Sequence, residues 1–304
     1  MDMPPSGSDR PDLDALRREW PGPAFLPPVA PAQEADGSLH YSGISYANHL
    51  GYRPLQLDLW VPQGHGPAAV VVWIHGGAWL FGDRRYLPET LEHQTVLNEL
   101  LAHGLAIASV DYRLSGEARF PAQLHDVKSA IRYLRHFADE LGLDPDRFGV
   151  WGESAGGHLA ALTALTSGRA DLEGDVGLPG SSEPVRAAVD WYGIADLTAM
   201  PFTRSSGFIG LLLGDRSEDA LRLAGPVTHV SPEAPPFLLI HGRKDGLVPA
   251  EQSEILHSAL CAVGAESELV LVDDADHIFL GHTDIPALVR QSAAFLAERL
   301  RPDS

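Results

Sequence analysis

Hydrophobic and polar residues alternate in two early segments of the chain, whereas later segments are continuously apolar. Residues 39–46 and 55–61 alternate, as in an antiparallel pair of strands with one half-exposed face. Six later apolar runs predict strands that are covered on both faces. These strands are predicted at residues 69–74, 105–110, 148–151, 186–191, 237–240 and 268–272.

Helical patterns fill most of the gaps between these strands. Helices are predicted at residues 88–103, 122–141, 154–166, 250–263 and 285–300. In the second of them, an apolar stripe of Leu124, Val127, Ile131 and Leu134 lies opposite three basic residues. The alternation of strands and helices predicts an α/β fold, a mostly parallel eight-stranded sheet flanked by helices.

Two segments interrupt this alternation. Residues 171–184 form a loop rich in Gly, Pro and Ser, and residues 196–235 separate the sixth and seventh predicted strands with only short helical patterns, at 208–213 and 218–223. An insertion of that length above a sheet edge is typical of a cap that shapes a pocket. We therefore expect an N-terminal extension at residues 1–38 that contributes to the cap, and a main domain at residues 39–300.

Composition narrows the classes of partner. A formal net charge of −19 over 304 residues disfavours nucleic acid and anionic membranes as partners. Cys261 is the only cysteine, so the chain forms no internal disulfide bond, and we expect this residue to be buried in a helix. The longest purely apolar run, residues 68–74, is too short to span a membrane, and no signal-peptide pattern opens the chain. We expect a cytoplasmic protein of undetermined oligomeric state.

Ser154 is the first candidate for chemistry. It is the centre of Gly152-Glu153-Ser154-Ala155-Gly156, which lies between a predicted strand and a predicted helix. The flanking glycines permit a tight turn that lifts the serine hydroxyl clear of the sheet. A G-x-S-x-G motif in this context predicts a nucleophile elbow.

A nucleophilic serine needs a base to take its proton, and the base needs an acid to orient it. Asp245 follows the predicted strand 237–240, and His277 follows the predicted strand 268–272. The order serine, acid, histidine is the one expected after a nucleophile elbow. His282 is the alternative base, and His257 lies within a helix. A lone Asp-Gly pair such as Asp245-Gly246 is otherwise typical of a turn.

The acids around His277 suggest a metal site only weakly. Asp273, Asp274 and Asp276 lie in one loop with His277, where adjacent acids are usually solvated. No second histidine cluster stands at metal-ligand spacing, so we expect no metal ion.

The negative oxygen of a tetrahedral intermediate needs backbone donors. The glycines Gly76 and Gly77 follow the third predicted strand and permit close backbone approach, and the amide of Ala155 lies next to the nucleophile. We expect these three amides to form an oxyanion hole. His75 and His158 are expected to be structural, bracing the loop and the packing behind the serine.

Together these motifs resemble the α/β-hydrolase fold, and within it the esterase and lipase branch related to hormone-sensitive lipase. The resemblance rests on five segments and covers about residues 39–300. The segments are Gly-Glu-Ser-Ala-Gly-Gly-His at 152–158, His-Gly-Gly-Ala-Trp at 75–79, Asp-Tyr-Arg-Leu at 111–114, Phe-Pro-Ala-Gln at 120–123 and His-Gly-x-x-Asp-x-x-Val-Pro at 241–249. The chain is most similar to bacterial bifunctional feruloyl and acetyl xylan esterases. It departs from the branch at Ala78, where a third glycine is usual, and at Ser115-Gly116, where Ala-Pro is usual.

The resemblance implies a serine carboxylesterase that hydrolyses small acyl or aryl esters through an acyl-enzyme, without a cofactor. It implies that Asp111 and Arg113 brace the active-site loops and that Asp126 is structural. The aromatic residues expected nearest the substrate follow or face the catalytic ends of strands, and they are Trp79, Trp191, Tyr192 and Phe208.

Two alternatives remain open. Kynurenine formamidases also resemble this branch, so an amidase or formamidase is possible on the same triad. A non-catalytic ligand-binding protein is the other alternative, although such proteins lack the triad histidine. The acyl group, the alcohol and the pathway are not readable from the sequence.

Overall fold

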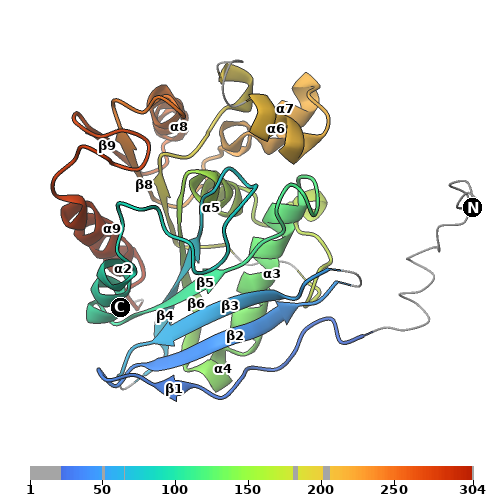
Figure 1. Cartoon of the computed structure of the whole chain (residues 1–304), viewed down its shortest axis with the longest axis vertical. Coiled ribbons are helices and arrows are strands. Elements are labelled where there is room, and N and C mark those ends of the chain that lie inside the picture. The colour runs from blue at the N-terminus through green and yellow to red at the C-terminus, as the bar shows by residue number, and fades with distance from the viewer. Residues whose placement is uncertain (1–21, 50–51, 65, 181–183, 201–205, 303–304) are drawn as a thin grey trace, which may run out of the picture.

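One sheet of nine strands runs through the computed structural model, which describes residues 22–49, 52–64, 66–180, 184–200 and 206–302 (Figure 1). The strand order is β1-β2-β3-β5-β4-β6-β7-β8-β9. In chain order the strands are β1 Ala32–Gln33, β2 Leu39–Ala47, β3 Leu55–Val61, β4 Ala68–Ile74, β5 Leu105–Val110, β6 Leu143–Glu153, β7 Ala187–Trp191, β8 Phe237–Gly242 and β9 Ser267–Val272. All eight predicted strands are confirmed, and β6 begins earlier than predicted.

Strand direction differs between the two sides of the sheet. β1, β2 and β3 are antiparallel neighbours, and β3 is antiparallel to β5. From β5 across to β9, every neighbouring pair is parallel. The predicted mostly parallel sheet is therefore confirmed, and it brings the carboxyl ends of β4, β6, β8 and β9 to one edge, where ligands usually bind in such sheets.

β1 is a ninth strand that corrects the predicted number of eight. It pairs Ala32 with His40 and Gln33 with Leu39, so part of the N-terminal extension belongs to the sheet. Both of its residues are exposed. A strand of two exposed residues carries no hydrophobic alternation, because backbone pairing alone holds it. Residues 1–21 of the predicted extension lie outside the described residues.

Helices connect the strands largely as predicted. The helices are α2 His93–Ala102, α3 Ala122–His136, α4 Ala138–Leu141, α5 Ala155–Leu165, α6 Ser206–Leu213, α7 Glu218–Ala224, α8 Glu251–Ala262 and α9 Ile285–Arg299, with short 3-10 turns η1 Ala170–Leu172, η2 Leu197–Ala199 and η3 Pro226–His229. α2 starts later than predicted. The helix predicted at 122–141 is divided at Phe137, whose ring packs against Tyr133.

The sheet is covered by helices on both faces (Figure 1). α3, α5 and α8 contribute to the core on one face, and α2 and α9 contribute to the core on the other. Alternate residues of β4 enter opposite cores, Val70 and Val72 on one side and Val71 and Trp73 on the other. This is the arrangement that a continuously apolar strand requires, because its side chains alternate between two buried faces.

The basic side of α3 is buried beneath the loop that follows α5. Lys128 donates hydrogen bonds to the Thr166 carbonyl at 2.6 Å and to Glu173 Oε1 at 2.8 Å. Arg132 donates to the carbonyl oxygens of Glu173 and Val176, each at 3.1 Å. Burial lowers the pKa of Lys128, although the Glu173 carboxylate acts in the opposite direction. Charged side chains of the helix thus satisfy the backbone of an irregular loop.

The insertion between β7 and β8 folds into short helices, as its local patterns predict. Figure 1 shows α6 and α7 at the end of the molecule away from β1. The Leu212 carbonyl accepts a hydrogen bond from the Phe120 amide at 2.9 Å, and the Ala224 carbonyl lies 2.8 Å from His158 Nε2. These bonds tie the insertion to the main domain. Residues 201–205 lie outside the described residues, and the role of the insertion as a cap stays a prediction.

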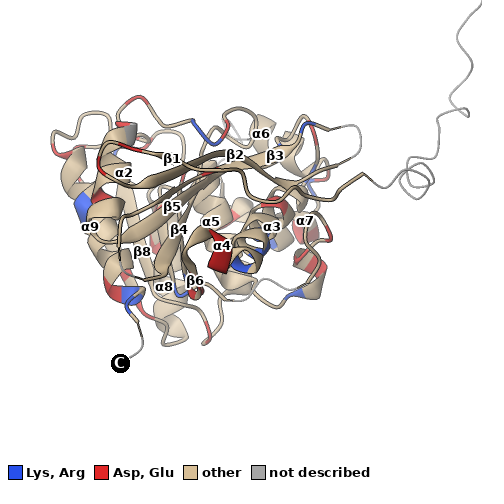
Figure 2. Ribbon diagram, turned by 90° about the horizontal axis from the view of Figure 1, so that it is seen from below, with Lys and Arg blue, Asp and Glu red and all other residues tan. Residues whose placement is uncertain are grey.

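Charged residues and the single cysteine both lie at the outside of the molecule. Figure 2 shows charged residues mainly on the helices and loops at the outside of the molecule. Cys261 is exposed on α8, so the expectation of a buried cysteine is wrong. Leu260 is directed into the core, and the next residue points about 100° further around the helix. In the part of the chain that the structure describes, no helix is both long enough and apolar enough to cross a membrane.

Replacing Lys128 tests how much the buried ion pair stabilises the fold. We expect Lys128→Met to lower the free energy of unfolding by about 3 kcal/mol, because it takes the nearer cation, at 2.8 Å, away from the buried carboxylate of Glu173. Urea denaturation measures the change. Arg222→Met is the control, because the Arg222–Glu218 pair is exposed and should contribute nothing measurable. Equal stability of the two variants would contradict the prediction.

Candidate active site

Ser154 lies in a strained turn between β6 and α5. Its backbone has φ 55° and ψ −117°, a conformation that residues other than glycine rarely adopt. The Ser154 amide donates to the Trp191 carbonyl at 2.8 Å, which fixes the turn against β7. This is the geometry that the sequence motif predicts.

Two glycines make the turn possible. A Cβ atom built on Gly152 would lie 2.1 Å from the Gly156 carbonyl oxygen, and one built on Gly156 would lie 1.9 Å from the Ile74 carbonyl oxygen. Both neighbours are backbone atoms, which cannot rotate away as a side chain can. The first turn of α5 therefore touches the end of β4 through a position that only glycine fills.

The three predicted residues Ser154, His277 and Asp245 form a continuous hydrogen-bonded chain. Ser154 Oγ lies 2.8 Å from His277 Nε2, and His277 Nδ1 lies 2.6 Å from Asp245 Oδ2. Each residue follows a parallel strand, β6, β9 and β8 respectively. The shared edge of the sheet therefore brings together side chains that are far apart in sequence.

Asp245 is held as a carboxylate. Its Oδ1 accepts from the amides of Leu247 and Val248, both at 2.8 Å. Its Oδ2 is shared by His277 and His241, the latter with Nε2 at 3.1 Å. Burial alone would raise the pKa of Asp245, but the hydrogen bonds from the two histidines outweigh it and lower that pKa to about 2.

His241 is a supporting residue that the sequence reasoning did not assign. Its Nδ1 lies 2.7 Å from Ser253 Oγ, and its side chain is fully buried. His241 is the first residue of the His-Gly-x-x-Asp segment. That spacing does not predict that its ring and His277 contact the same carboxylate oxygen of Asp245, as they do in the structure.

The competing histidines lie elsewhere. His282 Nδ1 lies 2.9 Å from Asp274 Oδ1, and His257 Nδ1 lies 2.9 Å from Ser267 Oγ, so His277 and not His282 reaches Ser154. Asp273 pairs with Arg243, and Asp276 Oδ1 accepts from two amides of its own turn. Among the described residues, no three His, Cys, Asp or Glu side chains are grouped as metal ligands.

The loop after β4 differs from the prediction at one of its donors. The Gly76 amide donates to Glu153 Oε1 at 2.5 Å, so it is not available to an oxyanion. The next residues, Gly77, Ala78 and Trp79, all have positive φ, at 96°, 54° and 55°. Within the described part of the chain, no hydrogen bond uses the amides of Gly77, Ala78 or Ala155. The expectation that the Gly76 amide is a free donor is therefore wrong, and the neighbouring Ala78 amide has no partner among the described residues.

His75 and His158 have the structural surroundings expected of them. His75 Nδ1 lies 2.8 Å from the Gly76 carbonyl oxygen, and its ring stacks on Tyr112 at 4.3 Å between centroids. His158 packs edge-on against Trp79 at 5.0 Å. Burial lowers the pKa of both histidines to about 4, so both are neutral at pH 7.

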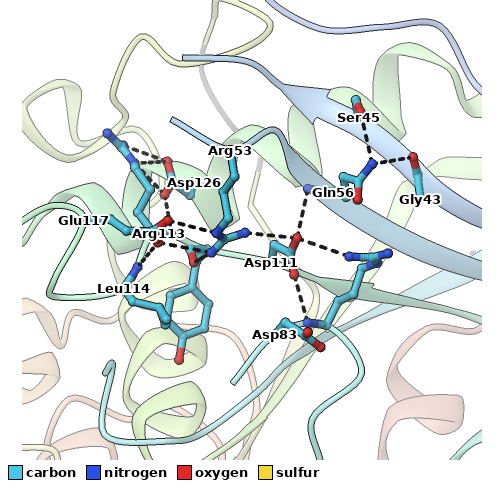
Figure 3. A network of polar contacts seen from close by, with 12 residues as sticks. Gly43, Ser45, Arg53, Gln56, Asp83, Asp111, Arg113, Leu114, Glu117 and Asp126 are labelled. Carbon is cyan, nitrogen blue, oxygen red and sulfur yellow. Dashed lines mark hydrogen bonds and ion pairs between the residues drawn. The ribbon is translucent and has the colours of Figure 1, made fainter. Parts of the chain in front are cut away.

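A polar network joins the loop after β4 to the segment after β5 (Figure 3). Asp111 accepts from the Arg84 amide at 2.9 Å and from the Gln56 amide at 3.3 Å. Arg113 holds the buried Asp126 through two short contacts, Nη2 to Oδ1 at 2.7 Å and Nε to Oδ2 at 2.8 Å. The bracing contacts expected of Asp111, Arg113 and Asp126 are present: Asp111 ties Arg84, in the loop that carries Gly77, to β3, and Arg113 ties the segment after β5 to α3.

The predicted pocket aromatics divide into two groups. Trp191 is fully buried on the α9 side of the sheet, where its indole Nε1 donates to Ser292 Oγ at 3.0 Å. It packs between Trp151 and Phe279, so its expected pocket position is wrong. The last residue of β7 points into the core because of strand alternation, and the sequence alone did not reveal which face that was.

The other aromatics lie nearer the candidate chemistry. Tyr192 follows β7 with φ 46°, and its ring meets the His277 ring edge-on at 4.9 Å between centroids. Trp79 is almost fully buried beside His158. Phe208 is half-buried on α6, and its contact with substrate stays a prediction.

The chain is similar to a family of known proteins and to several named esterases. The family model described as BD-FAE matches residues 57–260. Esterase LipC of Mycobacterium tuberculosis is 35% identical over 261 residues, which cover 82% of this chain and 62% of that protein. Two further M. tuberculosis relatives are covered to 53% and 57% of their length, so the chain spans somewhat more than half of these curated relatives.

Two solved structures extend the comparison to the fold. A truncated form of a carbohydrate esterase from gut microbiota is similar with a TM-score of 0.75 and 28% identity, covering 89% of this chain and 99% of that one. A bifunctional GH43-CE protein of Bacteroides eggerthii is similar with a TM-score of 0.74 and 33% identity, covering 85% of this chain and 38% of that one. The predicted fold is confirmed by these neighbours.

A methyl group at Gly156 tests the close contact beneath the turn. We expect Gly156→Ala to lower the free energy of unfolding by about 3 kcal/mol or more, because the new Cβ overlaps the Ile74 carbonyl oxygen. Gly116→Ala is the matched control, since no atom lies within 4 Å of a Cβ at that position. Denaturation followed by circular dichroism measures both. A Gly156→Ala protein as stable as the control would refute the packing argument.

Proposed function

The chain belongs to the BD-FAE family, and from this premise we propose that it is a carboxylic ester hydrolase acting through an acyl-enzyme on Ser154. The observation that carries the proposal is the hydrogen-bonded chain from Ser154 Oγ through His277 to Asp245. A serine, a base and an oriented acid in this arrangement are the parts of nucleophilic acyl transfer.

In the first half-reaction, Ser154 Oγ attacks the ester carbonyl carbon while His277 Nε2 takes the serine proton. Asp245 holds His277 Nδ1 as the donor, so Nε2 carries the lone pair that accepts this proton. Its carboxylate also stabilises the imidazolium that forms. The alcohol leaves with the proton returned from His277, and the acyl group remains on Ser154.

The negative oxygen of the tetrahedral intermediate is assigned to the amides of Gly77, Ala78 and Ala155. The support for this assignment is that these amides have no other partner among the described residues. Ala155 is also the first residue of α5, so its amide lies at a helix N-terminus, where the helix dipole favours negative charge. Losing one such donor typically costs about 100-fold to 1,000-fold in kcat.

In the second half-reaction, a water molecule attacks the acyl carbon. His277 Nε2 takes a proton from the water and returns it to Ser154 Oγ as the acid is released. Every proton is accounted for by His277, so this chemistry calls on no metal ion and no organic cofactor. A non-catalytic binding role has no comparable need for an oriented base.

Small acyl or aryl esters are the proposed substrates. LipC is named an esterase, and one similar structure is named a carbohydrate esterase, so simple esters and acetylated sugars both belong in a substrate panel. Amides and N-formylkynurenine belong there too, because the same triad supports amide cleavage. No contact in the described residues favours an amide over an ester.

Removing the nucleophile tests the mechanism. We expect Ser154→Ala to fold normally and to lose p-nitrophenyl acetate hydrolysis by at least about 1,000-fold, because no other group can form the acyl-enzyme. Labelling of the wild-type protein, but not the variant, by a fluorophosphonate probe is the companion measurement. A Ser154→Ala protein with wild-type kcat would overturn the assignment.

A substrate panel tests the reaction class. We expect aryl acetates and short-chain esters to give the highest kcat/KM, with N-formylkynurenine and simple amides lower by at least about 100-fold, corresponding to about 2.7 kcal/mol in the transition state. Steady-state kinetics on one enzyme preparation measures all of them. Preferred turnover of the formamide would replace the esterase proposal with a formamidase.

A further inference from the structure

Glu153, immediately before Ser154, is a buried acid that the mechanism above does not use. Its side chain is 2% exposed, at the end of β6. The carboxyl lies against the backbone of Gly76, so closely that a Cβ at that glycine would be 2.3 Å from Oε1 and 2.5 Å from Oε2. The acid therefore packs between the nucleophile turn and the loop that carries Gly77.

The contacts of this carboxyl are polar but uncharged. Oε1 accepts from the Gly76 amide at 2.5 Å. The Tyr192 hydroxyl faces the carboxyl without the geometry of a full hydrogen bond, and Tyr86 and Tyr112 are the other titratable groups that sense its charge. In the described ranges of the chain, no Lys, Arg or His forms an ion pair with Glu153. An ionised carboxylate without a cation is costly in such surroundings.

Two other buried acids, Asp126 and Asp245, have the arginine or histidine partners that Glu153 lacks. Asp126 is paired with Arg113, and Asp245 receives two histidines and two amides. The lack of a cation at Glu153 matters because of where this residue lies. It directly precedes Ser154 in the sequence, and its carboxyl group contacts Gly76, the residue before Gly77. A negative charge here would oppose the negative oxygen that develops during acyl transfer.

We propose that Glu153 is a positioning residue whose uncharged carboxyl group holds the Gly76 amide, which directs the neighbouring Gly77 and Ala78 amides toward the oxyanion. Ionisation of Glu153 places a negative charge behind the oxyanion hole and slows the reaction. The inference rests on the proposed esterase function and adds a residue that controls the alkaline side of its pH dependence.

The proton balance of Glu153 agrees with this role. Burial raises its pKa from 4.5 to about 8, and the Gly76 amide and Tyr192 lower it by less. The group is therefore protonated at neutral pH and ionises in the mildly alkaline range. Between pH 4.5 and about 8, the folded protein keeps a proton on Glu153 that the unfolded chain has released. The contribution of Glu153 to the free energy of unfolding is therefore complete below pH 4.5 and is lost as the pH rises to about 8.

The pH dependence of kcat tests the proposal with p-nitrophenyl acetate, corrected for its spontaneous hydrolysis. We expect the kcat of the wild-type protein to fall with a midpoint near pH 8, whereas Glu153→Gln, which accepts from Gly76 but cannot ionise, lacks this fall. Glu251→Gln, an exposed change on α8, should keep the wild-type profile. A Glu153→Gln profile that falls like the wild type would overturn the proposal.

A second variant separates positioning from charge. Glu153→Ala removes the acceptor, and we expect kcat at pH 7 to fall about 100-fold with KM changed only a few-fold, because the oxyanion amides lose their alignment. Restoration of most of this loss by glutamine supports the proposal, and an alanine variant with wild-type kcat contradicts it. If Glu153→Ala does not fold, the pH dependence of kcat of Glu153→Gln tests the proposal instead.

Thermal unfolding supplies a readout that does not depend on the esterase assignment. Between pH 4.5 and about 8, we expect wild-type Tm to fall relative to that of Glu153→Gln, since only the wild type loses a stabilising proton. Parallel Tm curves would contradict the protonation state. Ser154→Ala separates a failure of the esterase proposal from a failure of the proposal for Glu153. If Ser154→Ala abolishes turnover while the kcat of Glu153→Gln still falls at alkaline pH, the esterase function stands and only the role of Glu153 fails.

Discussion

The contact between the turn at Ser154 and the end of β4 is the constraint on which the rest of the site depends. Gly156 rests against the Ile74 carbonyl, and no other residue type fits there. The same contact sets Glu153 against Gly76 and leaves the next amides of the loop without internal partners. One backbone approach thus brings together the turn at Ser154, the loop after β4 and the buried Glu153. The strain of Ser154, at φ 55°, persists because β6 is paired on both sides within the sheet and α5 is packed into the core on one face of it.

The buried acids Asp245 and Glu153 differ in the partners of their carboxyl groups and in the direction in which their pKa is shifted. Asp245 must remain negative to orient His277, and four donors surround it. Asp126 is paired with Arg113, although burial raises its pKa by more than the guanidinium lowers it. In the proposed reaction a negative charge on Glu153 would oppose the oxyanion, and its carboxyl group faces the Gly76 amide and the Tyr192 hydroxyl instead of a cation. Asp245 and Glu153 therefore have opposite proton states, because their partners differ.

Much of this was readable in advance. Continuous apolar runs predicted the parallel strands because a strand buried on both faces needs hydrophobic residues at every position. The order Ser154, Asp245, His277 after successive strands predicted that the three would meet, because parallel strands end at one edge. Two kinds of feature were not predicted correctly from the sequence. β1 is held by backbone pairing, which leaves no side-chain pattern. Cys261 and Trp191 were assigned to the wrong surroundings because a hydrophobic residue type does not say which face of its element is covered.

The sequence by itself therefore determined the fold class, the strand and helix positions and the identity of the three residues that meet at the sheet edge. These follow from local periodicity and from the order of motifs, both of which are properties of the chain alone. The tertiary structure decided which amides are free, since the loss of Gly76 as a donor depends on a side chain 77 positions away. It also decided the surroundings of His241 and Glu153. Hydrogen-bond partners and desolvation are set by atoms brought together in space, and no spacing along the chain encodes them.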